Sequence, residues 1–389
     1  MVLYAKSLGA SATVLGLLTG MMPLLVILQI PAANHVSRVG YRQFVYAGWG
    51  IRVLFIFAMT LVPLSGGFLD PTTRLVLLLA LLFVFNVSRG ISSAGWLPWI
   101  ASLVPAHVRG HYLARDAAVV NLACGASCLL AAVGLGAQPT PSRFALLFGF
   151  SAVMGAISLF FLKRIPEGTP PEAERRSTTP VPWLSLLGFP PFQKLLAMVI
   201  PWAAAFGGAQ AFTIVYLKAA GLNEARILLV SSVFFLGGLS SLWLLGSRLD
   251  RIGSKPVLTA SFAAWALVMA AWAVVAGRGL ADRLALVLVL QFLMGLLAAM
   301  VGMANSRLLM AIAPVMGRNH FFALFSVAAN VTQGLAPVAW GLLIDAVGTR
   351  HLPGPGLEWN NFSLFFTAVA LVFLAALALA RKLQEELTS

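Results

Sequence analysis

The stretch Gly246-Ser247-Arg248-Leu249-Asp250-Arg251-Ile252-Gly253-Ser254-Lys255 is a short polar segment between two long apolar runs. It reads G-x-x-x-D-R-x-G-x-K, in which an acid and an arginine are followed by a glycine and another cation. Glycine at such a position is typical of a tight turn. A loop of this length cannot hold a domain, and we expect it to join two helices that cross a membrane.

The composition supports a membrane protein. Of the 389 residues, 60% are apolar and 10% are charged, whereas soluble proteins carry about 25% charged residues. Apolar runs of about 20 residues recur, and each can cross a hydrocarbon layer of about 30 Å. We predict an all-α polytopic membrane protein with about 11 visible spans. They lie near residues 12–33, 43–63, 74–97, 117–137, 143–162, 192–217, 226–245, 257–276, 283–304, 321–347 and 362–380.

The membrane topology explains the net charge of +14. Most Lys and Arg residues lie in alternate short loops, as the positive-inside rule describes. We therefore expect no nucleic-acid partner, a cytoplasmic C-terminus and a place in the lipid bilayer of a bacterial cytoplasmic (inner) membrane. Cys124 and Cys128 lie one helical turn apart in an apolar run, so neither a disulfide framework nor a metal site is indicated.

The chain contains an internal repeat. Tyr4 aligns with Tyr216 at an offset of 216 − 4 = 212 residues. Ser37 aligns with Asp250 at an offset of 250 − 37 = 213. A third pair, Arg109 and Arg318, gives 318 − 109 = 209. Three matches at nearly one offset predict two similarly built halves in parallel orientation.

A charged, proline-rich segment separates the two halves and has the composition of a flexible linker. We predict an N-terminal half over 1–163, a cytoplasmic linker over 164–191 and a C-terminal half over 192–389. About 24 apolar residues precede Tyr216, but only three residues precede Tyr4. Two complete halves would have twelve spans in all. We therefore expect the first of these twelve to be missing from this sequence. A misassigned start and a true eleven-span variant both remain open.

The ten-residue stretch and its repeat resemble the loop signature of the major facilitator superfamily, over essentially the whole chain. The resemblance implies a two-half helical bundle, a cavity between the halves and alternating access. In that family the signature helps to hold the cytoplasmic side together. The corresponding gating candidates here are Asp250, Arg251, Gly253, Lys255, Ser37, Arg38, Gly40, Arg42, Arg109 and Arg318. Because Ser37 stands where an acid is expected, we predict that Asp250→Asn alters gating more than Ser37→Ala.

Four residues are candidates for solute binding: Arg89, Asn86, Gln210 and Gln291. An arginine inside a span costs about 2.5–3.5 kcal/mol on insertion scales and normally faces the bundle interior. Arg89, with Asn86 one turn earlier, could bind an anionic or zwitterionic solute, or could instead be drawn to the interface. Gln210 is flanked by glycines that leave room for a ligand. Both glutamines could equally make hydrogen bonds between helices.

Arg52 lies near the middle of the span 43–63. We favour a structural or inter-helix role for it, because this span is not usually one that lines the cavity in the family. No acid lies at the middle of a span, so the sequence does not identify a proton carrier.

No set of nucleophile, base and orienting residue occurs, and no phosphate-binding loop is present. We predict that the chain is not an enzyme and needs no metal or cofactor. The favoured function is secondary active transport of a small solute by a monomer, with a coupling ion. The alternative is a polytopic membrane regulator or scaffold that does not transport.

Overall fold

The computed structural model describes residues 1–383 except for a few segments. The residues outside the description are 11, 136–139, 169–182, 223, 246–247, 314–317, 349–351, 355–356 and 384–389. Most of the predicted linker and the first two residues of the ten-residue stretch therefore lie outside the described residues.

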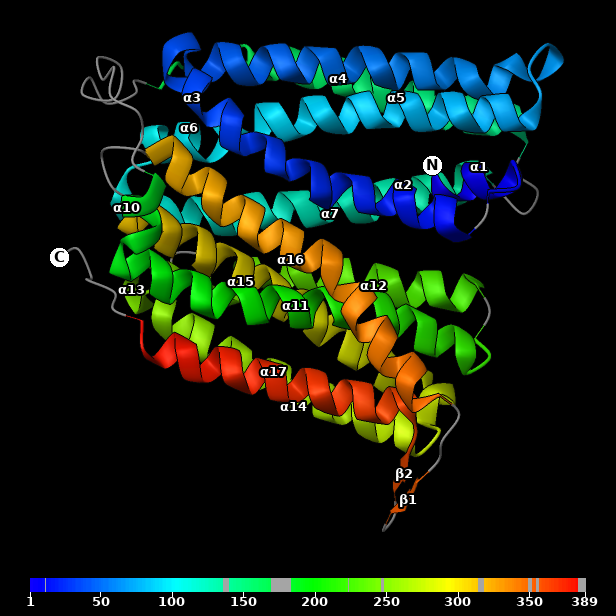
Figure 1. Cartoon of the computed structure of the whole chain (residues 1–389), viewed down its shortest axis with the longest axis vertical. Helices are drawn as coiled ribbons and strands as arrows, with labels where there is room; N and C mark the ends of the chain where they lie inside the picture. Colours follow the sequence, from blue (N-terminus) through cyan, green and yellow to red (C-terminus); the bar gives the residue numbers. More distant parts are fainter. Residues whose placement is uncertain are drawn as a thin grey trace. The chain divides into compact units, whose positions relative to one another are not determined.

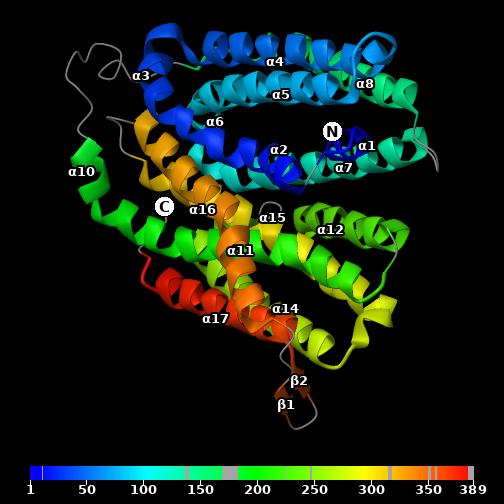
Figure 2. The same ribbon diagram turned by 45° about the vertical axis from the view of Figure 1, so that its right-hand side comes forward.

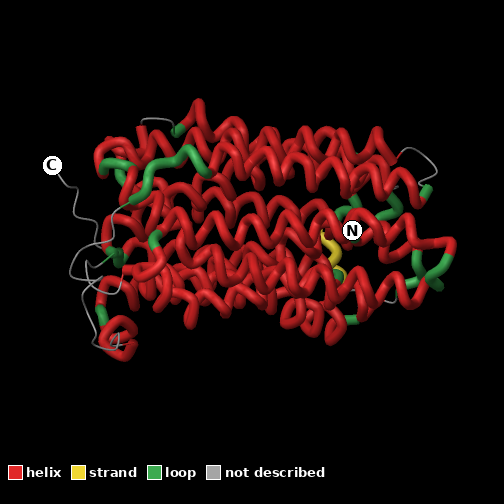
Figure 3. The backbone as a smooth tube through the Cα atoms, turned by 90° about the horizontal axis from the view of Figure 1, so that it is seen from above, coloured by secondary structure: helices red, strands yellow, loops and turns green. Residues whose placement is uncertain are grey.

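The described chain is almost entirely helical (Figure 3). Helices satisfy their own backbone hydrogen bonds, which is what an apolar solvent demands. Among the described residues, ten helical stretches are long and apolar enough to cross a membrane, and the apolar part of a further helix, Leu229–Ser241, is shorter. The prediction of an all-α polytopic protein is confirmed.

The chain forms two compact units, each described by itself. Unit 1 comprises Met1–Leu103, Leu129–Trp183 and Ala313–Val331, and unit 2 comprises Val104–Cys128, Leu184–Ile312 and Thr332–Ser389. Helices α7 (Arg109–Leu135) and α16 (Arg318–Val347) contribute residues to both.

The other elements of unit 1 are helices and short 3-10 turns. They are α1 (Val2–Ser7), α2 (Ala12–Leu24), η1 (Leu25–Leu28), α3 (Gln29–Val39), α4 (Tyr41–Leu64), η2 (Ser65–Gly67), α5 (Pro71–Ser92), η3 (Ser93–Gly95), α6 (Trp96–Leu103) and α8 (Pro141–Leu162).

Unit 2 adds a small hairpin to its helices. Its elements are η4 (Ala106–Val108), α10 (Trp183–Gly188), α11 (Pro190–Ala219), α12 (Glu224–Leu244), α13 (Arg248–Ile252), α14 (Ser254–Gly277), η5 (Leu280–Asp282), α15 (Leu284–Ile312), β1 (Leu352–Gly354), β2 (Leu357–Trp359) and α17 (Asn361–Arg381). The two strands are antiparallel, with Leu352 opposite Trp359.

Local sequence explains where helices begin. The Asp70 carboxylate accepts a 3.0 Å hydrogen bond from the Thr73 amide, and Pro71 occupies the first turn of α5. This is the usual chemistry of a helix start. The hydroxyl and the amide of Thr73 hold the pKa of Asp70 below its ordinary value. Asn360 and Ser363 form a reciprocal capping box at the start of α17.

Helix α4 is the centre of the packing in unit 1, with α5 and α8 beside it (Figures 1 and 2). The Ser88 hydroxyl donates a 3.0 Å hydrogen bond to the Gly48 carbonyl, and a side chain at Gly48 would overlap Ser92. Small and hydroxylated residues let helix backbones approach closely in membranes.

In unit 2, helix α14 packs along α17. Trp265 stacks on Phe373 with ring centroids 4.9 Å apart, and Trp272 stacks on Phe366 at 5.7 Å. All four side chains are fully buried. Offset aromatic pairs of this kind add to the stability that apolar burial provides.

Two predicted loops are shorter than expected. The predicted spans leave residues 98–116 between them, but α6 continues to Leu103 and α7 begins at Arg109. They also leave residues 305–320 between them, but α15 continues to Ile312 and α16 begins at Arg318. Hydropathy marks where a chain leaves an apolar environment, whereas a helix ends where its backbone hydrogen bonds stop.

Candidate functional site

The loop that follows α12 is a short helix and a glycine turn. Leu249 of α13 is fully buried and anchors this segment in unit 2. Gly253 has φ of 87°, which suits glycine and reverses the chain into α14. Asp250 precedes this turn, and its side chain lies beside the start of α7, which belongs to the same unit.

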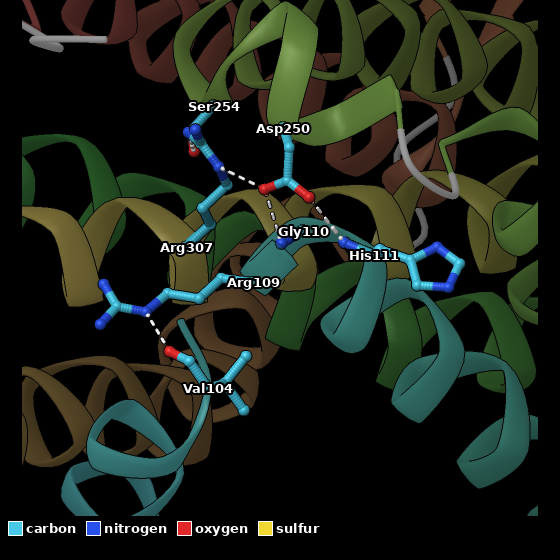
Figure 4. A network of polar contacts seen from close by, with 7 residues as sticks. All are labelled: Val104, Arg109, Gly110, His111, Asp250, Ser254 and Arg307. Atoms are coloured by element: carbon cyan, nitrogen blue, oxygen red, sulfur yellow. Dashed lines mark hydrogen bonds and ion pairs between the residues drawn. The ribbon is translucent and has the colours of Figure 1, made fainter. Parts of the chain in front are cut away.

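Asp250 caps the start of α7. Its Oδ1 accepts a 2.8 Å hydrogen bond from the Gly110 amide, and its Oδ2 accepts a 3.0 Å hydrogen bond from the His111 amide (Figure 4). The first amides of a helix have no partner within the helix. They also form the positive end of its dipole. One carboxylate thus satisfies two such amides, although it lies 140 residues away in the sequence.

Arg307 of α15 is the positively charged partner of Asp250. Its Nε lies 3.3 Å from Asp250 Oδ1, and its NH1 donates a 3.2 Å hydrogen bond to the Ser254 hydroxyl (Figure 4). The Arg307 and Asp250 side chains are only 12% and 13% exposed. Arg251, the neighbour predicted to act with Asp250, is exposed and has no hydrogen bond or ion pair with any described residue.

Gly110 allows the carboxylate to come close. A Cβ atom at this position would lie 2.7 Å from Asp250 Oδ1, closer than real Cβ contacts allow. The Arg109 guanidinium points elsewhere, and its Nε donates a 3.1 Å hydrogen bond to the Val104 carbonyl (Figure 4). Arg109 therefore binds the turn before α7, whereas Gly110 and the His111 amide hold Asp250.

The loop of the first repeat is built differently. Gly40 has φ of 95° and makes the same kind of turn as Gly253. The Arg42 amide donates a 3.0 Å hydrogen bond to Glu167 Oε1, and Arg42 Nε lies 3.5 Å from Oε2. Both side chains are more than a third exposed. Here the acid comes from the segment after α8, and Ser37 is half-buried.

The first-repeat loop contacts the start of α16, and the remaining gating candidates lie in different places. His320 Nε2 and Asn34 Oδ1 are 2.5 Å apart within unit 1. The Arg318 guanidinium lies 6.0 Å from the Phe322 ring, at the limit of a cation–π contact. Arg38 is exposed, and Lys255 lies in the first turn of α14.

The predicted solute residues are not gathered into one site by any described contact. Gln291 is buried on the same face of α15 as Gly295, which packs on α12. Gln210 is exposed on α11. The adjacent glycines do not leave room for a ligand as expected, because Gly207 contacts the Gln333 backbone and Gly208 contacts the Trp340 ring, both from α16.

The arginine of α5 has a different setting. Arg89 is half-buried, and Asn86 is buried with its amide donating 2.9 Å to the Leu82 carbonyl of its own helix. Arg52 is also in unit 1, on the neighbouring helix α4. This pair of like charges was not expected from the sequence.

Sequence reasoning missed Arg307. It is one of many cations near helix ends, and no local pattern distinguishes it from them. Arg307 and Asp250 are 57 residues apart in the sequence, so no local pattern could predict that they pair.

Comparison with known protein families identifies the family of this chain. The sequence model described as Major Facilitator Superfamily matches residues 1–246 and 211–388. No curated protein sequence matches the chain. The proton:xylose symporter XylE has a similar structure, with a TM-score of 0.77, 15% identity, and coverage of 98% of this chain and 89% of that chain.

Two further structures show the same fold. The E. coli fucose:proton symporter FucP gives a TM-score of 0.71 at 15% identity, covering 98% of this chain and 93% of that chain. The human organic anion transporter MFSD10 gives 0.70 at 16% identity, covering 97% and 87%. The family match extends over nearly the whole sequence, and the chain belongs to the major facilitator superfamily.

Proposed function

We propose that the chain is a secondary active transporter that moves a small solute by alternating access between its two sequence halves, 1–163 and 192–389. The observation that carries this proposal is the Asp250 carboxylate. It comes from the second half of the sequence, and it caps a helix from the first half. A cap of this kind can be released and remade, which suits a gate that closes in only part of a transport cycle.

The charged loops support one orientation. Asp250 lies among the cation-rich loops that the positive-inside rule places in the cytoplasm. The gate would then close the cytoplasmic side, with the C-terminus on the same side. This arrangement fits a multi-pass protein of a bacterial inner membrane.

The similar structures and two residues of α5 support a coupling ion and a class of solute. XylE and FucP are described as proton symporters, which supports a proton as the coupling ion here. MFSD10 is described as an organic anion transporter, and Arg89 with Asn86 supports an anionic or zwitterionic solute.

The test is transport by the purified chain in proteoliposomes. Labelled xylose, fucose, succinate and glutamate are offered with an imposed proton gradient and again after a protonophore has collapsed it. We expect saturable uptake of at least one solute that depends on the gradient and falls in Arg89→Ala and Asp250→Asn. Lys163→Gln, which removes an exposed cation at the end of α8, serves as the control and should transport as the wild type does.

The alternative is a regulator or scaffold built on the same fold. It would bind a partner protein at one-to-one stoichiometry and show no uptake of any of these solutes. That pair of results would overturn the transporter proposal.

A further inference from the structure

Two arginines lie inside the candidate membrane spans of adjacent helices in unit 1. In the candidate span Tyr41–Gly67, Arg52 is 52 − 41 = 11 residues from one end and 67 − 52 = 15 from the other. In the span Pro71–Leu103, Arg89 is 89 − 71 = 18 and 103 − 89 = 14 residues from the ends. Helices α4 and α5 run side by side (Figures 1 and 2).

Arg52 is held in place by aromatic contact. Its guanidinium lies 3.9 Å from the centre of the Trp49 ring. The Trp49 indole is fixed in turn, since it donates a 2.6 Å hydrogen bond to the Ser158 hydroxyl of α8. Stacking on an aromatic face leaves the N–H groups at the edge of a guanidinium available for other acceptors.

The hydrogen-bonding capacity of Arg52 is not used within the described chain. Arg52 is 9% exposed, and its Nε is buried without a hydrogen-bond partner among the described residues. Arg89, which is half-buried, likewise has no hydrogen bond or ion pair with a described residue. Buried charges are normally paired, because a cation removed from water loses its hydration.

No described acid of unit 1 offsets the two charges. Its described acids are Asp70, which binds Thr73 at the start of α5, and Glu167, which binds Arg42. Two like charges on neighbouring helices cannot neutralise each other. The arrangement is therefore two positive charges on neighbouring helices, one of them stacked on a tryptophan ring, that lack a counter-ion in the described part of this unit.

We propose that Arg52 and Arg89 form an anion-binding site for a carboxylate or phosphate group of the solute. Guanidinium groups match the planar fork of these oxyanions and can donate two parallel hydrogen bonds to each. A bound oxyanion would supply the acceptor that Arg52 Nε lacks and would offset the positive charge of the arginines. This inference rests on the proposed transport function, because it names the class of solute.

Binding can be measured without transport. The purified full chain in lipid nanodiscs is heated with increasing succinate or inorganic phosphate, against sodium chloride at equal ionic strength. A ligand at concentration L that binds only the folded state stabilises it by RT ln(1 + L/Kd), so the Tm rises with the logarithm of the ligand concentration once that exceeds Kd. The compared variants are Arg52→Gln, Arg89→Gln, Arg52→Lys, Arg89→Lys and the exposed control Lys163→Gln.

We expect at least one of the two oxyanions to raise the Tm of the wild type and of Lys163→Gln. The apparent Kd should rise by about tenfold or more in each Gln variant. It should rise less in the Lys variants, which keep the charge and lose the fork. The Lys variants keep the test decisive if a Gln variant does not fold. Response to succinate alone identifies a carboxylate solute, and response to phosphate alone identifies a phosphorylated one.

Two results would overturn the site. One is no Tm shift with either oxyanion in the wild type. The other is an equal shift in all variants, which would place the anion elsewhere.

The outcomes also separate the two proposals. Binding of succinate or phosphate without uptake of the same labelled anion would contradict transport and support the site. Uptake of a neutral sugar without any anion effect would contradict the site alone.

Discussion

Asp250 satisfies two helix amides and one arginine with a single carboxylate. The Gly110 and His111 amides and Arg307 converge on it, and none of them is near it in the sequence. The side chain is 13% exposed, so water offsets little of what its removal would cost. Ser37, at the matching position of the first repeat, has no carboxylate to perform this role.

Replacing Asp250 with Asn should loosen the start of α7. An Asn side chain keeps one acceptor oxygen but turns an NH2 group toward an amide, and it loses the charge that Arg307 pairs with. A charged hydrogen bond of this kind contributes about 1.5–3 kcal/mol. Hydrogen–deuterium exchange of peptides covering 109–112 should become faster. Ser37→Ala serves as the comparison, and equal exchange in the two variants would contradict the role of Asp250.

Gly110→Ala should disturb the same contact from the other side. The added Cβ would lie 2.7 Å from the carboxylate, so Asp250 must move away. We expect a lower Tm and faster exchange at the start of α7, although alanine is the better helix former. Gly302→Ala is the matched control, because a Cβ there meets nothing within 4 Å. A Tm as high in Gly110→Ala as in the control would show that the loop adapts at no cost.

At the scale of elements, α12 and α15 pack through reciprocal glycines. A side chain at Gly237 would overlap the Phe292 backbone, and one at Gly295 would overlap the Phe234 backbone. Each glycine thus receives the main chain of the other helix. Gln291 lies one turn from Gly295 on this face, and its Oε1 is buried without a described hydrogen-bond partner.

Alanine at either glycine should force the two helices apart. Overfilling a packed interface costs about 1–3 kcal/mol, and backbone cannot move as a flexible side chain can. We expect Gly237→Ala and Gly295→Ala each to lower the Tm of the purified protein, and Gly302→Ala on the same helix to leave it unchanged or raise it. Equal Tm values for Gly295→Ala and Gly302→Ala would contradict close packing at this crossing.

At the scale of the whole molecule, the two repeats differ in how their loops meet the chain. The second-repeat loop carries an acid at the start of α7. The first-repeat loop meets the start of α16 through Asn34 and His320, and its cation Arg42 binds Glu167 instead. The repeat therefore predicts matching places for the two loops but not matching chemistry.

Adding an acid to the first repeat should slow the transport cycle. Ser37 lies one turn along α3 from Asn34, which contacts His320 in the first turn of α16. If an Asp at position 37 acts as Asp250 does in the second repeat, its carboxylate would face the start of α16, where the helix dipole favours negative charge by about 0.3–1 kcal/mol. We expect Ser37→Asp to reduce turnover in proteoliposomes by about two- to fivefold and to raise the Tm. Ser37→Ala should change neither quantity. Faster turnover in Ser37→Asp would show that this loop does not take part in closing the gate.

The membrane architecture and the family follow from the amino-acid sequence alone. Spans can be read from single runs of residues, because insertion into lipid depends on local apolar length. The loop around Asp250 could be found for the same reason, since its signature is contiguous. The division at 164–191 stays a prediction.

Which residues meet follows only from the tertiary structure. It paired Asp250 with Arg307 of α15 and filled the space beside Gly207 with α16. These contacts join positions that are far apart in sequence, and the sequence pattern is the same whether or not they form. Helix packing selects them, because each depends on the rotation and depth of two whole helices rather than on any local run of residues.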